Sequence, residues 1–261
     1  MTLPGYADWK DAKTALHAAS QILNAVRVAS LDPLPNALRH SLRPIPAGAT
    51  TGPLKAGGSL TLDYLQGAII YAHDGTDSMP VALNGNSQQS LFNTIVAAMT
   101  QTGHQLEPDR AKITSDEPFN LDLTQAQLYA EVQWRMFQML AVVKASMYGP
   151  QHPLVLWPHG FDLSVLWFAD GMDEGADLHL NIGFSPGTPD IGQPYVYFYA
   201  QPEVEDLRTH IPRQFQWITG WHAPGGYITY DQFATEREPE TMLAELLIEV
   251  YRTASGMIRS G

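Results

Sequence analysis

Apolar residues recur at helical spacing in four stretches of the chain. In the first stretch Trp9, Leu16 and Leu23 repeat every seven residues, which places them on one face of a helix. Four helices are therefore predicted. The first covers about residues 8–30, and the second runs from a capping Ser87 to a stop at Gly103. The third runs from a capping Asp122 to about Met147, and the fourth runs from Pro239 through Ala254.

Shorter stretches carry the alternating or β-branched pattern that is typical of strands. They lie within 59–83 and 153–200, and Thr229-Tyr230 closes the sheet region. The segment 32–58 contains five prolines and four glycines, so we expect a loop with short extended pieces there. Asp74-Gly75 is a hairpin signal.

The order of these elements is helix, strands, helix, helix, strands, helix. Because runs of strands are not separated by single helices, we predict the α+β class, with mainly antiparallel sheet and helices packed on it. We expect one compact domain over 1–261. The order of strands followed by helix occurs twice, which leaves two similar halves, 1–120 and 121–261, as an open alternative.

Charge and composition exclude several functional classes. The 261 residues hold 15 Lys and Arg against 27 Asp and Glu, a net charge of −12, which argues against nucleic-acid partners and anionic membrane surfaces. No apolar run is long enough for a membrane span, and the first residues lack a secretory h-region. The chain contains no cysteine, which excludes disulfides and thiolate chemistry and fits a cytoplasmic protein.

The acidic residues are not evenly distributed. The window 145–207 holds nine Asp and Glu and no Lys or Arg, so its net charge is −9, and the remaining 18 acids and 15 bases sum to only −3. Three histidines and several tryptophans and tyrosines lie in the same window. A site in this window would favour a cationic or neutral ligand over a phosphate ester.

Three motifs also fall in this window. They are L-W-P-H-G-F-D-L from Leu156 to Leu163, N-I-G-F-S-P-G from Asn181 to Gly187, and P-Y-V-Y-F-Y from Pro194 to Tyr199. They resemble an uncharacterised bacterial family, a domain of unknown function, with the motifs L-W-P-x-x-F-D-L, N-x-G-x-S-P-G and P-Y-x-Y. The resemblance implies a bacterial protein and supplies no activity.

We therefore expect a pocket within 156–199 that binds a small polar or cationic organic molecule. Aromatic walls and a few polar anchors are typical of such pockets. The predicted ligand-binding residues are Trp157, His159, Asp162, His179, Asn181, Ser185, Tyr195, Tyr197 and, from the first helix, His17, with Trp167 and Phe198 as further walls. If chemistry follows binding, His159 or His179 would be the general base and Asp162 would orient it. Whether the protein is an enzyme, and its oligomeric state, stay open.

Other readings of the same residues lead to different functions. A metal-dependent enzyme would use His159, Asp162, Asp177 and His179 as ligands, although no H-E-x-x-H or His-x-His spacing supports a metal site. Gly183-Phe-Ser185-Pro-Gly187 matches the G-x-S-x-G string of serine hydrolases, but Pro186 has no N–H for an oxyanion hole.

Two further interpretations of these residues involve no small-molecule site. In one, the aromatic surface binds a protein partner without catalysis; in the other, Trp157, Phe161 and Leu163 alternate on one strand face and simply fill the core. We predict no cofactor, because the chain has no Walker loop, dinucleotide-binding fingerprint or EF-hand string.

Overall fold

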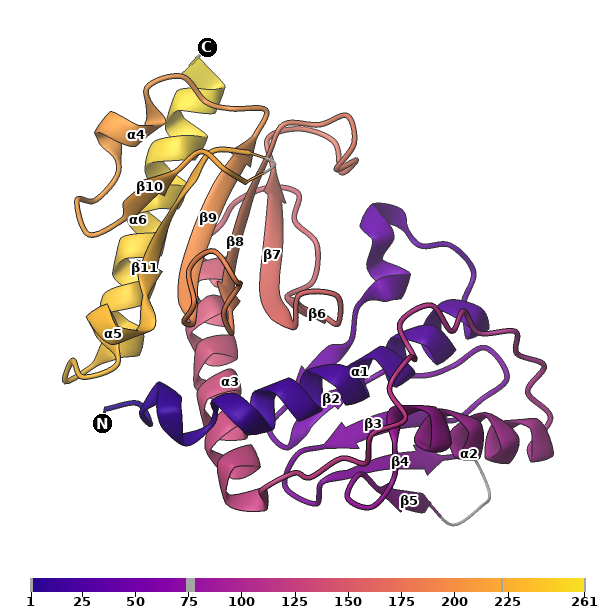
Figure 1. Ribbon diagram of the computed structural model, residues 1–261. Helices are drawn as coiled ribbons and strands as arrows, with labels where there is room; N and C mark the ends of the chain where they lie inside the picture. Colours follow the sequence, from indigo (N-terminus) through magenta and orange to yellow (C-terminus); the bar gives the residue numbers. More distant parts are fainter. Residues whose placement is uncertain (1, 74–77, 222, 261) are drawn as a thin grey trace. The chain divides into compact units, whose positions relative to one another are not determined.

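The computed structural model describes residues 2–73, 78–221 and 223–260, and the predicted hairpin at Asp74-Gly75 lies outside them. Within these ranges the strands form two antiparallel sheets, of five and six strands, with helices packed on them (Figure 1). The predicted α+β class is therefore confirmed. No helix in the described part of the chain is long and apolar enough to cross a membrane.

Internal contacts divide the chain into two compact units, which are described separately. Unit 1 comprises Met1–Tyr6, Arg135–Val155 and Asp162–Gly261, and unit 2 comprises Ala7–Trp134 and Leu156–Phe161. The division falls inside a long helix, α3 (Leu123–Ala145), and isolates the short segment 156–161 from the strand that follows it.

The sheet of unit 2 is a meander in which each strand pairs with the next along the chain. Its strands are β1 (Arg43–Ile45), β2 (Gly48–Thr50), β3 (Ser59–Asp63), β4 (Ala68–Ala72) and β5 (Met79–Ala82). The short β1 and β2 lie in the stretch that we predicted as a loop with extended pieces, and a 3-10 segment, η2 (Pro35–His40), precedes them.

Besides the first part of α3, unit 2 contains the helices α1 (Lys10–Ser30) and α2 (Gln88–Gln101), and both were predicted. Helix α1 buries Leu16 and Leu23 on one face and contacts β3. Helix α2 begins with a capping box in which the side chains of Ser87 and Ser90 each accept from the other's backbone N–H.

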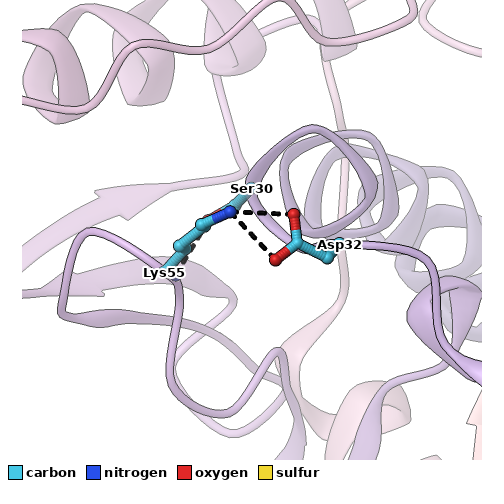
Figure 2. A network of polar contacts seen from close by, with 3 residues as sticks. All are labelled: Ser30, Asp32 and Lys55. Atoms are coloured by element: carbon cyan, nitrogen blue, oxygen red, sulfur yellow. Dashed lines mark hydrogen bonds and ion pairs between the residues drawn. The ribbon is translucent and has the colours of Figure 1, made fainter.

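The loop after β2 is tied to the end of α1 (Figure 2). The Lys55 ammonium donates to both carboxylate oxygens of Asp32, at 2.8 and 2.9 Å, and the Lys55 backbone N–H donates to Ser30 Oγ at 3.2 Å. Because the Lys55 and Asp32 side chains are exposed, this ion pair contributes little to stability.

The six-stranded sheet has the strand order β10-β11-β9-β8-β7-β6, and it belongs to unit 1 except for Leu156 and Trp157 of β6, which are assigned to unit 2. The strands are β6 (Val155–Trp157), β7 (Asp162–Phe168), β8 (His179–Ser185), β9 (Tyr195–Gln201), β10 (Gln216–Ile218) and β11 (Gly225–Thr229), and the helices are α4 (Leu207–His210), α5 (Tyr230–Phe233) and α6 (Pro239–Ser260). Pro239 starts α6, as predicted. Strand β10 was not predicted, because it lies outside the stretches 59–83 and 153–200 in which we predicted strands.

One face of this sheet is apolar and packs against α6. It carries Trp167 of β7, Ile182 of β8 and Phe198 of β9, all of them buried. The Trp167 ring meets the edge of Tyr251, a residue of α6, at a centroid distance of 5.4 Å. Since side chains alternate along a strand, the other face carries the residues between these positions.

The predicted strand face shared by Trp157, Phe161 and Leu163 was wrong. Strand β6 ends at Trp157, and β7 starts only at Asp162. In the turn between them, the Phe161 N–H donates to the Trp157 carbonyl at 2.7 Å, and Phe161 has a φ of 57°. A left-handed residue cannot continue the alternation of a strand.

Candidate functional site

Residues of all three motifs meet on the second face of the unit 1 sheet. In the antiparallel register of β8 and β9, Asn181 lies opposite Tyr199, Gly183 opposite Tyr197, and Ser185 opposite Tyr195. Paired residues point to the same face, so the second motif supplies small polar side chains and the third supplies a row of phenols. We call Tyr195, Tyr197 and Tyr199 the tyrosine row.

Asp162 joins this face through a hydrogen bond from the centre of the row. The Tyr197 hydroxyl donates to Asp162 Oδ2 at 2.6 Å. Asp162 begins β7, and β8 lies between β7 and β9, so the phenol reaches across a strand. The phenol can cross β8 because Gly183 has no side chain. A Cβ placed there would lie 2.6 Å from both the Tyr197 Cζ and its hydroxyl oxygen. The glycine of the second motif therefore makes room for the tyrosine of the third.

Asn181 occupies the next position along β8. Its Nδ2 donates to the Tyr199 hydroxyl at 2.7 Å, while its Oδ1 is buried and has no hydrogen-bond partner among the described residues. Asn181 as a whole is only 8% exposed. A buried carbonyl oxygen without a donor is costly, so native proteins usually satisfy such atoms with protein, water or ligand.

Aromatic side chains from the neighbouring strand and loop surround the tyrosine row. Trp221 stacks on Tyr195 with a centroid distance of 5.9 Å and an interplanar angle of 21°, and it meets Tyr197 edge-on at 6.0 Å. Tyr227 of β11 also meets Tyr195 edge-on at 5.9 Å. The tyrosine row is buried, whereas Trp221, Tyr227 and Asp162 are half-buried and form its rim.

Burial keeps the phenols of this face protonated. Desolvation raises the pKa of Tyr197 well above its ordinary value, and the negative charge of Asp162 raises it further. Desolvation also raises the pKa of Tyr195, with smaller contributions from Asp162 and Asp190, and it raises the pKa of Tyr199 to about 12. The row therefore offers neutral hydroxyls and aromatic surface, and not phenolate nucleophiles or bases.

Ser185 lies at the end of β8 and belongs to a turn. Its Oγ accepts from the Gly187 N–H at 3.2 Å, and the chain continues through a loop into β9. A serine hydrolase elbow runs from a strand into a helix, so the strand-turn-strand arrangement agrees with our rejection of that mechanism.

His179 lies at the opposite end of β8 from Asp162. Leu163 pairs with Phe184 and Phe168 pairs with His179, so Asp162 and His179 are separated by about six residues of strand, roughly 20 Å. The His179 ring is buried beside Phe168, and its Nδ1 contacts the Asp177 carbonyl at 2.9 Å. The hypothesis that Asp162 orients His179 as a general base was therefore wrong, because the register keeps the two apart.

Three predicted site residues belong to unit 2 and lie together there. Trp157 is buried, and the rings of Trp157 and the exposed His159 are 6.0 Å apart. His17 of α1 holds the intervening turn, since its Nε2 contacts the Pro158 carbonyl at 2.8 Å. The His17 ring stacks on Phe161 at 5.2 Å, and burial lowers the pKa of this histidine. His17 thus contacts the turn of the first motif within unit 2. Its expected role in binding a ligand stays a prediction.

Trp167 and Phe198, which we predicted as further walls of the pocket, lie on the face of the sheet opposite the tyrosine row. Trp167 packs against α6, and Phe198 packs edge-on against Phe215 at 5.0 Å. Both alternate with residues of the tyrosine face and cannot line it.

Two rim residues were missed. Trp221 lies in a loop rich in glycine and proline, and Tyr227 follows two glycines, so neither belongs to a strand pattern that would connect it with the motifs.

Two other candidate sites are less well supported. Among the residues that the structure describes, no three His, Asp or Glu side chains lie close enough to hold a metal ion, so the metal-dependent alternative gains no support. A surface groove of about 640 Å³ lies between α3 and α6 of unit 1, next to Met139, Val142 and Ile248. None of the predicted site residues lines this groove.

Comparisons with known proteins agree with the expected resemblance to an uncharacterised family. A family of unknown function, DUF5996, matches the chain over residues 2–259. No curated protein and no solved structure matches it. The match extends from the first helix to the last and includes all three motifs. The chain therefore belongs to the family of unknown function DUF5996.

Proposed function

We propose that this protein binds a small polar or cationic organic molecule on the tyrosine face of the unit 1 sheet. The observation that carries the proposal is Asn181 Oδ1, a buried acceptor without a partner among the described residues, beside a row of three phenols. A ligand donor at this oxygen would remove the cost of leaving it unpaired.

The composition of this face supports binding. Ligand sites combine apolar or aromatic walls with a few polar groups that fix orientation. Here the walls are the tyrosine row and Trp221, and the polar groups are Asn181 and Asp162. Trp221 and Asp162 at the rim of this face are half-buried, so both side chains are partly accessible to a solute.

Binding accounts for these residues better than catalysis does. Burial raises the pKa of each tyrosine, so the phenols stay protonated near neutral pH. The histidine closest along β8, His179, has its Nδ1 in contact with the Asp177 carbonyl. The hydroxyls and the amide act as positioning groups for a ligand that is recognised and not transformed by them.

Fluorine NMR tests this function directly. Protein labelled with 3-fluorotyrosine would be screened against millimolar amines, sugars and nucleosides, with the row assigned through Tyr195→Phe, Tyr197→Phe and Tyr199→Phe. We expect at least one compound class to shift the row resonances and leave Tyr148, which is 78% exposed on the same unit, unmoved. The proposal fails if no compound moves the row, or if the shifts are shared equally with Tyr148.

A further inference from the structure

Two side chains on the tyrosine face carry oxygens that can accept a hydrogen bond from a ligand, Asn181 and Asp162. The Asn181 side-chain N–H donates to the Tyr199 hydroxyl, and its buried Oδ1 has no hydrogen-bond partner among the described residues. Tyr197 uses its O–H group on the Asp162 carboxylate, which as an ionised group accepts several hydrogen bonds. A ligand that fits this arrangement brings N–H or O–H donors.

The charged side chains that act on the phenols of the row are acidic. Asp162 acts on all three phenols of the row, Asp190 acts on Tyr195, and Glu174 acts on Tyr199, and each of these negative charges disfavours phenolate formation. No Lys or Arg occurs between positions 145 and 207, where all of these residues lie. An anionic ligand would be repelled, and a cation would be attracted.

The two acceptors are connected through two stacked residues of the tyrosine row. Asn181 is bonded to Tyr199, Asp162 is bonded to Tyr197, and the rings of these two tyrosines are stacked 6.3 Å apart at an angle of 8°. The faces of Trp221 and Tyr195 lie beside them and suit both an apolar substituent and a positive charge.

We propose that the ligand of this face is a protonated primary or secondary amine with an apolar substituent. Its N–H groups donate to Asn181 Oδ1 and to the Asp162 carboxylate, and the substituent lies against Trp221 and Tyr195. This inference rests on the proposed function and narrows it. A quaternary ammonium ion would offset the negative charge of Asp162 but has no N–H group to donate to the two acceptors. A neutral alcohol could donate one hydrogen bond but would not offset the charge.

Four compounds of similar shape separate these requirements: benzylamine, benzyltrimethylammonium, benzyl alcohol and benzoate. Each would be titrated into the fluorotyrosine-labelled protein at neutral pH while the row resonances are followed. We expect benzylamine to bind roughly tenfold or more tightly than the other three, a difference of about 1.4 kcal/mol. Equal binding of benzyl alcohol or benzyltrimethylammonium, or preferred binding of benzoate, at the row would overturn the amine assignment and leave small-molecule binding intact. If none of the four moves the row while a sugar or nucleoside does, the assignment also fails and the binding function stands.

Variants identify the acceptors. We expect Asp162→Asn and Asn181→Leu each to weaken benzylamine binding roughly tenfold, whereas Glu245→Gln, which removes the same charge on the exposed side of α6, leaves it unchanged. Because Asn181→Leu introduces a bulkier apolar residue and could impair folding, Asn181→Asp serves as a second test. It keeps an acceptor and adds negative charge, so it should strengthen benzylamine binding. Unchanged affinity in Asp162→Asn and Asn181→Asp would overturn the assignment.

Discussion

The hydroxyl of Tyr197 crosses the middle strand of the motif region to donate a 2.6 Å hydrogen bond to Asp162. Asp162 begins β7, Tyr197 lies in β9, and the phenol passes over Gly183 of β8. One side chain thus connects a residue from each of the three motifs, although the motifs are separated along the chain. The predictions below test this connection and the surroundings that support it.

Removing the Tyr197 hydroxyl should destabilise unit 1. Tyr197→Phe keeps the ring and deletes the donor, and we expect a loss of about 1–2 kcal/mol in the free energy of unfolding, because Asp162 is charged but half-buried and can be rehydrated. Urea unfolding followed by tryptophan fluorescence measures this loss. The matched change Tyr227→Phe removes only an exposed hydrogen bond to Gln216 and should have little effect. Equal losses in both variants would show that the Asp162 contact has no special weight.

A methyl group at position 183 should have a larger effect. A Cβ there would lie 2.4 Å from the Leu163 carbonyl oxygen and 2.6 Å from the Tyr197 ring, so backbone or ring must move. We expect Gly183→Ala to lower the free energy of unfolding by about 2–3 kcal/mol or more. Gly220→Ala is the control, since nothing lies within 4 Å of its Cβ position. A Gly183→Ala variant as stable as Gly220→Ala would contradict the packing of Tyr197 over this position.

Acid should weaken the protein through His152. Burial holds the pKa of His152 at about 4, below its ordinary value of 6.5, and its Nδ1 contacts the Pro153 carbonyl at 2.6 Å. Between pH 6.5 and pH 4, His152 therefore binds a proton in the unfolded chain but stays neutral in the folded chain. Stability contributed by neutral His152 is complete above this window and falls with pH inside it, by up to about 3 kcal/mol.

Urea titrations across this pH window would measure the effect. His152→Asn keeps a donor near the Nδ1 position and removes the titration, so its stability should depend less on pH than that of the wild-type protein. His210→Asn alters an exposed histidine and should leave the wild-type slope unchanged. If His152→Asn retains the full slope, the acid sensitivity comes from other histidines.

The ion pair between Arg135 and Glu240 should stabilise the packing of α3 against α6 within unit 1. Arg135 Nε donates to the Glu240 carboxylate, the two side chains are only 16% and 28% exposed, and the guanidinium also donates to the Thr2 carbonyl at 3.0 Å. A double-mutant cycle with Arg135→Met and Glu240→Gln should give a coupling of about 1 kcal/mol.

A second pair provides the comparison for this cycle. Lys55 and Asp32 form a shorter-range loop contact with side chains that are 66% and 78% exposed (Figure 2). We expect no measurable coupling between them, because water screens both charges. A coupling at Lys55 and Asp32 as large as that at Arg135 and Glu240 would mean that burial does not control the strength of these pairs.

The helices could be predicted from the sequence because their signals are local. Ser87 caps α2 through its own side chain, and Pro239 begins α6 where its missing N–H costs nothing. Asp122 likewise accepts from the Thr124 N–H at 2.8 Å at the start of α3. The turn at Pro158–Phe161 was missed, because the left-handed conformation of Phe161 leaves no mark in the apolar pattern.

The site could be predicted only in part, because its residues are joined by register. Asn181, Tyr195 and Tyr197 were identified as candidates, and the structure brings them to one face of the sheet. Nothing in the order of residues says that Gly183 pairs with Tyr197, or that Trp221 returns to stack on Tyr195. Phe198 was chosen for its ring, but strand alternation directs it to the opposite face.

The glycine below Tyr197 also has a consequence for how the sheet is assembled. A shift of β9 by one residue would turn the tyrosine row toward α6, and a shift by two would bring Tyr197 over Asn181 or Ser185, whose side chains occupy that space. Only one alignment gives the phenol both a gap and a carboxylate. The residues proposed to recognise a ligand therefore also select the strand pairing. A substitution that added a functional side chain at Gly183 would remove the gap that favours this register.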